Sequence, residues 1–217
     1  MDPAEALRHW IVSSGLAESH GEVRLLQAYL ALLEKWNPRV NLTATTNWDE
    51  LGSLFAEGIW AAGFYPKGIV AHLDIGSGAG FPAIPMRVML PEMRLCMVES
   101  RTRRAAFLET VATGLHLDES RVICSRIEQV LRSHDAPPFD IVSWKGLKLS
   151  DEAFGLLLAA SRPKTQFWVF HGLELPMEAP ERAGRALNLT RREHFPGRPG
   201  WQLSIYNVSR ETRALGS

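Results

Sequence analysis

The sequence predicts an α/β fold: a mostly parallel sheet of about seven strands, preceded by a helical N-terminal extension. Two observations predict it. In the first 60-odd residues, apolar side chains recur at three- and four-residue spacing, which is typical of helices. From about residue 66 onward, short apolar runs alternate with helical stretches, which is typical of a parallel sheet covered by helices. We therefore divide the chain into a helical segment over residues 1–65 and an α/β domain over residues 66–217.

The helical segment contains two clear helices. One apolar face predicts the first of them, and Asn37-Pro38 is expected to end it. Asn47 is a plausible N-cap for the second, which runs to about residue 62, and residues 63–68 read as a connector. The apolar face of the first helix consists of Val23, Leu26, Tyr29, Leu30, Leu33 and Trp36.

The rest of the chain reads as alternating strands and helices. The last two predicted strands flank a long Pro-, Gly- and Arg-rich stretch without a clear crossover helix, which favours an antiparallel final pair. A mostly parallel sheet with such an edge pair is typical of Rossmann-like methyltransferases. The predicted strands cover residues 69–75, 94–99, 121–125, 139–144, 165–172 and 201–208, and the predicted helices cover 85–90, 103–115 and 151–161.

Composition excludes several classes of protein. Hydrophobic residues make up 46% and charged residues 22%, as in ordinary globular chains. Because Lys+Arg and Asp+Glu both number 24, nucleic acid could be attracted only by a local basic patch. No apolar run reaches the ~18 residues of a membrane helix, and the N-terminus lacks the apolar core of a signal peptide. We expect a cytoplasmic monomer without metal, in which Cys96 and Cys124 are both buried.

The strongest chemical signal is the run DIGSGAGFP over residues 74–82, which follows the first predicted strand. Glycines let the backbone approach a ligand closely, and open α/β sheets bind ligands at the carboxyl ends of their strands. The spacing is G-x-G-x-G rather than the dinucleotide G-x-G-x-x-G. Asp74 is poorly placed beside a pyrophosphate but suits a cationic ligand such as S-adenosylmethionine (AdoMet). Glu99, at the end of the next strand, can accept hydrogen bonds from ribose hydroxyls.

Two other interpretations of this run stay open. An ordinary tight turn would leave Asp74 in solvent, with no ligand bound. A nicotinamide cofactor would also use a glycine-rich turn, although Asp74 and the glycine spacing oppose it.

Four stretches together point to one family. WNPRVNLT (36–43) resembles the signature W-N-x-x-x-N-L-T, and residues 74–82 resemble D-x-G-[ST]-G-x-G-[FL]-P. ESRTRRAAFL (99–108) is similar to D-S-x-x-K-R-x-x-F-L, and SRIE (125–128) to S-R-[AV]-E. In these motifs the chain resembles the GidB family, the guanine-N7 methyltransferases of bacterial small-subunit ribosomal RNA.

This resemblance implies AdoMet as cofactor and methyl transfer to N7 of a guanine in 16S ribosomal RNA. The partner is then ribosomal RNA or the small ribosomal subunit. Ile127 and Glu128 would frame the adenine, although Ile127 can also be explained simply as a core residue. The other implied cofactor residues are Asp74, Gly76, Gly78 and Gly80 around the methionine end, Phe81 lining the pocket, and Glu99 at the ribose.

The departures from the family fall on the side expected to meet RNA. After the fourth strand, Trp144-Lys145-Gly146 stands where the family has S-R-A. SLFAEG over 53–58 stands in place of the family's R-H-x-x-D-S. Near the end of the chain, Trp201-Gln202 replaces a late R-H, and His171-Gly172 replaces a K-G. Lys145 keeps the charge but not the planar fork of arginine. An AdoMet-binding relative with another substrate or weak activity therefore remains the alternative function.

Guanine N7 carries a free lone pair, so its methylation needs no general base. We expect Lys145, which we place beside the cofactor, to orient the guanine. Trp144 reads either as a base-stacking platform or as a packed strand-end aromatic. The basic residues that could contact RNA could equally form an ordinary solvated surface: Arg101, Arg103, Arg104, Arg126, Lys145, Lys148, Arg191, Arg192 and Arg198.

Overall fold

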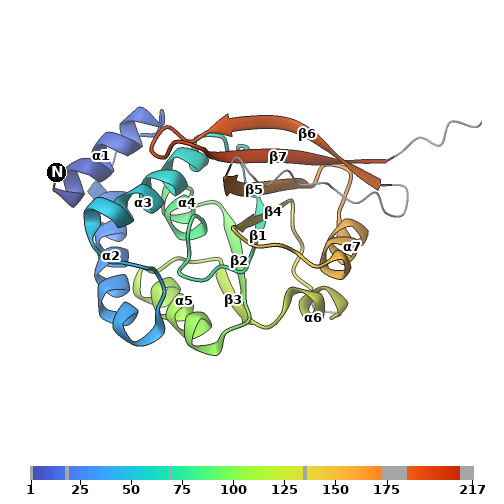
Figure 1. Cartoon of the computed structure of the whole chain (residues 1–217), viewed down its shortest axis with the longest axis horizontal. Coiled ribbons are helices and arrows are strands. Elements are labelled where there is room, and N and C mark those ends of the chain that lie inside the picture. The colour runs from blue at the N-terminus through green and yellow to red at the C-terminus, as the bar shows by residue number, and fades with distance from the viewer. Residues whose placement is uncertain (1, 18–19, 69, 134–135, 173–184, 211–217) are drawn as a thin grey trace, which may run out of the picture.

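The computed structural model describes residues 2–17, 20–68, 70–133, 136–172 and 185–210 (Figure 1). Three helices come first: α1 (Pro3–Ser13), α2 (His20–Val40) and α3 (Trp48–Ala62). The remaining elements are β1 (Ala71–Ile75), α4 (Ala83–Met89), β2 (Arg94–Glu99), α5 (Thr102–Gly114), β3 (Ser120–Cys124), α6 (Ile127–Arg132), β4 (Ile141–Lys145), α7 (Asp151–Ala160), β5 (Gln166–Gly172), β6 (Arg185–His194) and β7 (Trp201–Arg210).

The seven strands form one sheet in the order β3-β2-β1-β4-β5-β7-β6. Strands β1 to β5 pair in parallel, whereas β7 runs antiparallel to both β5 and β6. The predicted mostly parallel α/β sheet with an antiparallel end is thus confirmed. Strand β6 was not expected, because it lies in the Arg-rich stretch and, as an edge strand with one neighbour, shows little apolar alternation.

Helices cover both faces of the sheet. Alternate side chains of β1, β2, β4 and β5 point to opposite faces, and each face has its own apolar core. One core contains residues of α1 to α5 with Leu95, Met97 and Trp168, and the other contains residues of α6 and α7 with Leu73 and Val142. Because the N-terminal helices share the first core with the sheet, they pack directly on it, as Figure 1 shows. The domain boundary near residue 65 stays a prediction.

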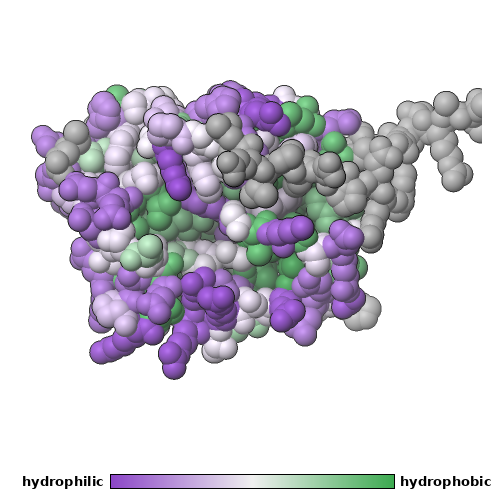
Figure 2. Space-filling view, in the orientation of Figure 1, coloured by the Kyte–Doolittle hydropathy of each residue, from purple (hydrophilic) through white to green (hydrophobic). Residues whose placement is uncertain are grey.

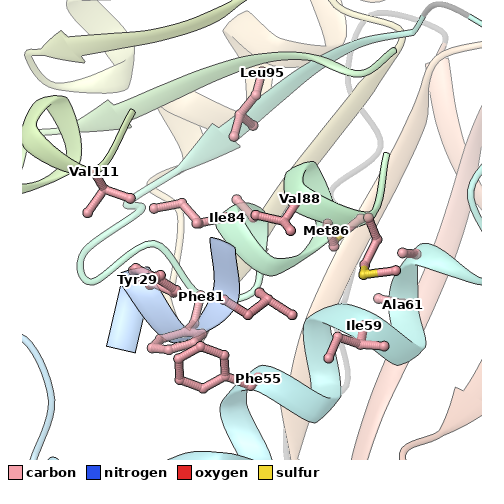
Figure 3. Packing of buried hydrophobic residues seen from close by; sticks show 14 of the residues in the cluster. Tyr29, Phe55, Ile59, Ala61, Phe81, Ile84, Met86, Val88, Leu95 and Val111 are labelled. Carbon is pink, nitrogen blue, oxygen red and sulfur yellow. The ribbon is translucent and has the colours of Figure 1, made fainter. Parts of the chain in front are cut away.

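Helix α2 holds the glycine turn in place through Tyr29. The Tyr29 hydroxyl donates to the backbone carbonyl of Ala79 at 2.5 Å, and the ring packs against Phe55, Phe81 and Phe107. Figure 3 shows Tyr29, Phe55 and Phe81 gathered at the start of α4. The glycine turn therefore packs on an aromatic cluster to which the N-terminal helices contribute Tyr29 and Phe55.

The signature WNPRVNLT turns the chain at the end of α2. The Asn37 side chain accepts hydrogen bonds from the backbone N–H groups of Leu42 and Thr43 and donates to the Thr43 carbonyl. Asn41 adopts a left-handed φ of 52°, and its carbonyl accepts a hydrogen bond from Arg104 of α5. The prediction that α2 ends at residues 37–38 was wrong, because Pro38 fits in the last turn and the helix continues to Val40.

The structure corrects the expectation for one cysteine. Cys96 is buried, but Cys124 is exposed at the end of β3. Strand β3 lies at the edge of the sheet and pairs with one neighbouring strand, β2. Within the described ranges, no helix is long and apolar enough to cross a membrane. Within the same ranges, no three metal-ligating side chains gather, and the absence of a metal stays a prediction.

We expect Tyr29→Phe to loosen the glycine turn, because the substitution removes the only side-chain donor that the structure gives the Ala79 carbonyl within the described residues. An unsatisfied buried acceptor costs about 1–3 kcal/mol of unfolding free energy. Urea denaturation measures this loss, and amide hydrogen exchange of residues 76–81 should accelerate. Tyr206→Phe, on the opposite face of the sheet, is the control. If both variants leave exchange in the turn unchanged, Tyr29 does not hold it.

Candidate cofactor site

The site lies where the strand order reverses, between β1 and β4. In open α/β sheets, the carboxyl ends of the strands at this switch point form the ligand crevice. A pocket of about 200 Å³ opens there. Figure 2 shows hydrophobic surface exposed at the centre of one face of the molecule, between hydrophilic borders. The pocket is lined by Ile75, Gly76, Val98, Ser100, Ser125, Arg126, Ile127, Glu128, Leu147, Lys148, Leu149 and Ser150.

The glycine turn that follows β1 has a backbone conformation that residues with a side chain rarely adopt. Gly76, Gly78 and Gly80 all have positive φ values, 68°, 56° and 94°. A Cβ on Gly80 would collide with the Ile84 side chain, so this glycine serves close packing on α4. A Cβ on Gly78 would meet no atom closer than 3.7 Å. A Cβ on Gly78 would thus touch Arg104 Nη1 and the Gly76 carbonyl without a clash, so the left-handed φ rather than lack of room favours glycine there.

Asp74 is 2% exposed and carries one unpaired carboxylate oxygen. Its Oδ1 accepts a hydrogen bond from the Ser143 hydroxyl at 2.5 Å, whereas Oδ2 has no hydrogen-bond partner among the described residues. Burial is the main cause that raises the pKa of Asp74 to about 6, while the hydrogen bond from Ser143 and the nearby hydroxyl of Ser77, which donates to the Asp74 backbone carbonyl, oppose the rise. A buried carboxylate with a free oxygen is matched to a cationic ligand. The interpretation of Asp74 as a solvated turn residue is therefore wrong.

Glu99 joins the glycine turn to the start of α5. Its Oε2 accepts from the backbone N–H of Gly78 at 2.9 Å and its Oε1 from that of Arg101 at 2.8 Å. The side chain is 5% exposed. Each oxygen keeps a second lone pair, so the geometry allows the predicted contact with ribose hydroxyls.

Ile127 and Glu128 line the pocket beside Gly76, as the family resemblance implies. Ile127 is also buried among the residues of the α6–α7 core, so its two interpretations are compatible. The Glu128 carboxylate accepts from the Ser150 hydroxyl at 2.7 Å, which is the main cause that lowers its pKa. Glu128 is thus a fixed acceptor at the pocket wall.

Of the nine predicted cofactor residues, Gly76, Ile127 and Glu128 line this pocket. Asp74, Gly78, Gly80 and Glu99 lie at or against the glycine turn, outside the lining, and Phe81 and Lys145 have other partners. Phe81 is buried in the aromatic cluster with Tyr29 and Phe55, and it is not among the residues that line the pocket. Lys145 donates from Nζ to the buried carboxylate of Glu57 in α3. Trp144 packs against Phe167 on the opposite face of the sheet, which decides for a packed aromatic over a stacking platform.

Sequence reasoning missed the role of Glu57. This carboxylate is 1% exposed and accepts from Lys145 Nζ and from the indole N–H of Trp201. The three residues come from α3, β4 and β7, and they meet only through the sheet topology. An acid among apolar neighbours in the predicted helix over 47–62 was the available signal.

A model of the GidB protein family, described as rRNA small subunit methyltransferase G, matches residues 22–195. The chain belongs to the GidB family. It is 33% identical over 174 residues to "Ribosomal RNA small subunit methyltransferase G" of Neisseria meningitidis, covering 76% of this chain and 83% of that protein. It is 37% identical over 133 residues to the protein of the same name from a Roseiflexus species, covering 59% of this chain and 56% of that protein.

The fold agrees with this family. A solved structure of a SAM-dependent methyltransferase from Aquifex aeolicus superposes with a TM-score of 0.55 at 14% identity, covering 73% of this chain and 92% of that one. The GidB chain is thus a Rossmann-like, AdoMet-dependent methyltransferase, and the nicotinamide interpretation is wrong. The free oxygen of Asp74, the left-handed glycine turn and the neighbouring pocket fit AdoMet.

We expect Gly78→Leu to abolish AdoMet binding, because the added side chain projects from the turn that we expect to meet the methionine end, beside Arg104 Nη1 and the Gly76 carbonyl at 3.7 Å from its Cβ. Calorimetric titration with AdoMet measures the loss. Gly15→Leu is the matched control: Gly15 also has a positive φ, 71°, and a Cβ there meets nothing within 4 Å. Both variants carry comparable backbone strain. Wild-type affinity in Gly78→Leu would place the ligand elsewhere.

We also expect AdoMet affinity to fall as the pH decreases through about 6, the raised pKa of Asp74. A proton and the ligand's ammonium group compete for the same carboxylate, so each pH unit below this value should weaken binding up to about tenfold. Calorimetry from about pH 8 to about pH 5 measures the profile. Asp74→Asn should bind weakly with no such dependence. A flat wild-type profile would contradict this role of Asp74.

Proposed function

We propose that this chain transfers the methyl group of AdoMet to N7 of a guanine in 16S ribosomal RNA. The family match over residues 22–195 is the observation that carries the proposal. AdoMet supplies an electrophilic methyl group on its sulfonium. The chain supplies binding and alignment. The reaction needs neither a nucleophilic side chain nor a general base, because guanine N7 already carries a lone pair.

Each part of the site has a task in this reaction. Asp74 binds the ammonium group and the turn at Gly78 admits the methionine end to the backbone. Glu99 holds the ribose, and Ile127 with Glu128 bounds the adenine. The contacts of Glu99 with Gly78 and Arg101, and of Glu128 with Ser150, support these roles because they fix both carboxylates before the ligand arrives.

Lys145 is the residue that we propose to orient the guanine. It ends β4, next to β1, and its charge favours the ionised form of Asp74. Its Nζ is held by Glu57 and lies 5.4 Å from the centre of the Trp201 ring. A lysine fixed in this way donates along a set direction to an acceptor such as guanine O6 or N7.

The substrate is a loop or an exposed end of the RNA, or a base in a partly assembled subunit. Guanine N7 in an A-form helix lies in a deep, narrow groove that side chains do not enter. Arg126 and Lys148 line the pocket and offer charge for neighbouring phosphates. Arg191 and Arg198 instead lie over the rings of Phe64 and Trp201. The chain then works in the cytoplasm, as a monomer on the small ribosomal subunit.

The alternative is an AdoMet-dependent relative with another substrate. The absence of the family's Arg and His at Ser53 and Leu54, and of its late Arg-His at Trp201 and Gln202, favours it. Incubation with small ribosomal subunits and methyl-labelled AdoMet, followed by nucleoside analysis, separates the two. Labelled 7-methylguanosine supports our proposal. Unlabelled RNA from a protein that binds AdoMet selects the alternative.

We expect Lys145→Ala to slow methylation of ribosomal subunits about ten- to a hundredfold, as for the loss of a guanine contact worth roughly 1–3 kcal/mol. AdoMet affinity should change much less, and Lys145→Arg should raise activity, because its planar fork matches the acceptor pair on guanine.

The control for this prediction concerns Glu57. Lys145→Ala leaves the buried carboxylate of Glu57 without a cation, and this loss is destabilising by itself. Glu57→Gln keeps an acceptor for Trp201 and removes the charge. The double variant should therefore regain stability in thermal unfolding and remain slow. Recovery of the rate in the double variant would show that Lys145 acts only through the fold.

A further inference from the structure

Four polar side chains form a row on the face of the sheet that α1 to α5 cover. The Tyr65 hydroxyl lies 3.0 Å from Nδ1 of His72, and Nε2 of His72 lies 2.7 Å from Oγ of Ser143. The row ends where the Ser143 hydroxyl meets Asp74. His72, Ser143 and Asp74 are all buried, and Tyr65 also stacks on the His72 ring. An apolar pair would pack a sheet more simply than His72 and Ser143, so the row calls for a function.

The protonation states of the row follow from burial. Burial lowers the pKa of His72 to about 3, so its imidazole is neutral near pH 7 and carries one N–H. Burial also raises the pKa of Tyr65 well above its ordinary value, so the phenol keeps its proton. Each of Tyr65, His72 and Ser143 thus has one proton to donate, and the three protons can point in only two consistent ways along the row.

Only one of these two directions serves an ionised Asp74. If Tyr65 donates to Nδ1 of His72, Nε2–H donates to Ser143 and the Ser143 hydroxyl donates to Asp74. If the direction reverses, Ser143 donates to His72 instead, and its oxygen lone pairs face the carboxylate at 2.5 Å. In the first direction the Tyr65 hydroxyl is the donor that begins the chain, so it strengthens the hydrogen bonds that follow it toward Asp74.

We propose that Tyr65, His72 and Ser143 are positioning residues for AdoMet binding: they form a directed chain of hydrogen bonds that fixes Oδ1 of Asp74 and leaves Oδ2 for the ammonium group. This inference rests on the proposed role of Asp74. None of the three residues contacts the ligand. They act by holding the carboxylate in one orientation and in its charged form, which binding requires.

Other ionisable groups around Asp74 also act on its charge. Glu99 of β2 raises the pKa of Asp74 and Lys145 of β4 lowers it. Cys96 of β2 and Tyr29 of α2 feel the Asp74 charge in turn. These groups stay in place in the variants below, so a shifted pH profile reports on the row itself.

The test is calorimetric titration of the full chain with AdoMet between about pH 5 and about pH 8. Ser143→Ala should weaken binding near pH 7 about three- to tenfold and move the midpoint of the pH profile upward by about one unit, because it removes the donor that favours the ionised form. Ser143→Thr keeps the hydroxyl and should restore the wild-type midpoint. Thermal unfolding confirms that each variant is folded.

Tyr65→Phe is the sharper variant, because it deletes one hydroxyl two hydrogen bonds away from Ser143. We expect about a two- to threefold loss of affinity and an upward shift of the same midpoint, since the chain that donates to Asp74 loses its first donor and its remaining hydrogen bonds weaken. Tyr206→Phe, a buried tyrosine of β7 in the opposite core, is the matched control and should leave the midpoint unchanged.

The outcomes separate this inference from the proposed function. If Asp74→Asn loses AdoMet binding while Ser143→Ala and Tyr65→Phe keep the wild-type affinity and midpoint, the row is structural only and the inference is overturned. If Asp74→Asn binds normally, the ammonium contact and the inference both fail. Methylation of ribosomal subunits by the wild-type chain, measured separately, decides the proposed function.

Discussion

The site depends on three buried carboxylates near the carboxyl ends of the strands, each of which must be compensated by a donor or a cation. Asp74, Glu57 and Glu99 are each at most 5% exposed, and a buried charge is costly unless donors or a cation meet it. Each is met by a different part of the chain. Backbone N–H groups on either side of Glu99 bind it, Lys145 and Trp201 bind Glu57, and Ser143 binds Asp74. Satisfying these acids joins α3, β1, β2, β4 and β7 at the crevice.

The same constraint explains why one acid differs from the others. Glu57 and Glu99 have partners on both oxygens, whereas Asp74 has a partner on one. Glu57 and Glu99 are therefore satisfied by the folded chain, whereas Asp74 keeps one oxygen for the cationic ligand that we propose. The N-terminal helices share in this arrangement, because Tyr29 of α2 supports the turn that follows Asp74.

Local patterns predicted much of this structure, and long-range contacts escaped prediction. Apolar runs located the parallel strands, and the glycine run located the crevice, because both signals lie within a few consecutive residues. Strand β6 escaped because an edge strand needs apolar side chains on one face at most. The motif assigned Phe81 to the pocket, but its ring fills the space between Tyr29 and Phe55. Lys145 was found as a cation, but its partner Glu57 lies 88 residues away.

The cluster of Glu57, Lys145 and Trp201 has a consequence for how the sequence can vary. Lys145 and Trp201 lie 88 and 144 positions after Glu57 in the chain. Glu57 supplies the negative charge, Lys145 the positive charge and Trp201 a neutral donor. Removing the charge of Glu57 or Lys145, or the donor of Trp201, leaves a partner without its counterpart, so the loss of one of these groups is tolerated best together with a change at a second position. The three positions therefore form one epistatic unit, and this unit includes Lys145, the residue proposed to meet the substrate.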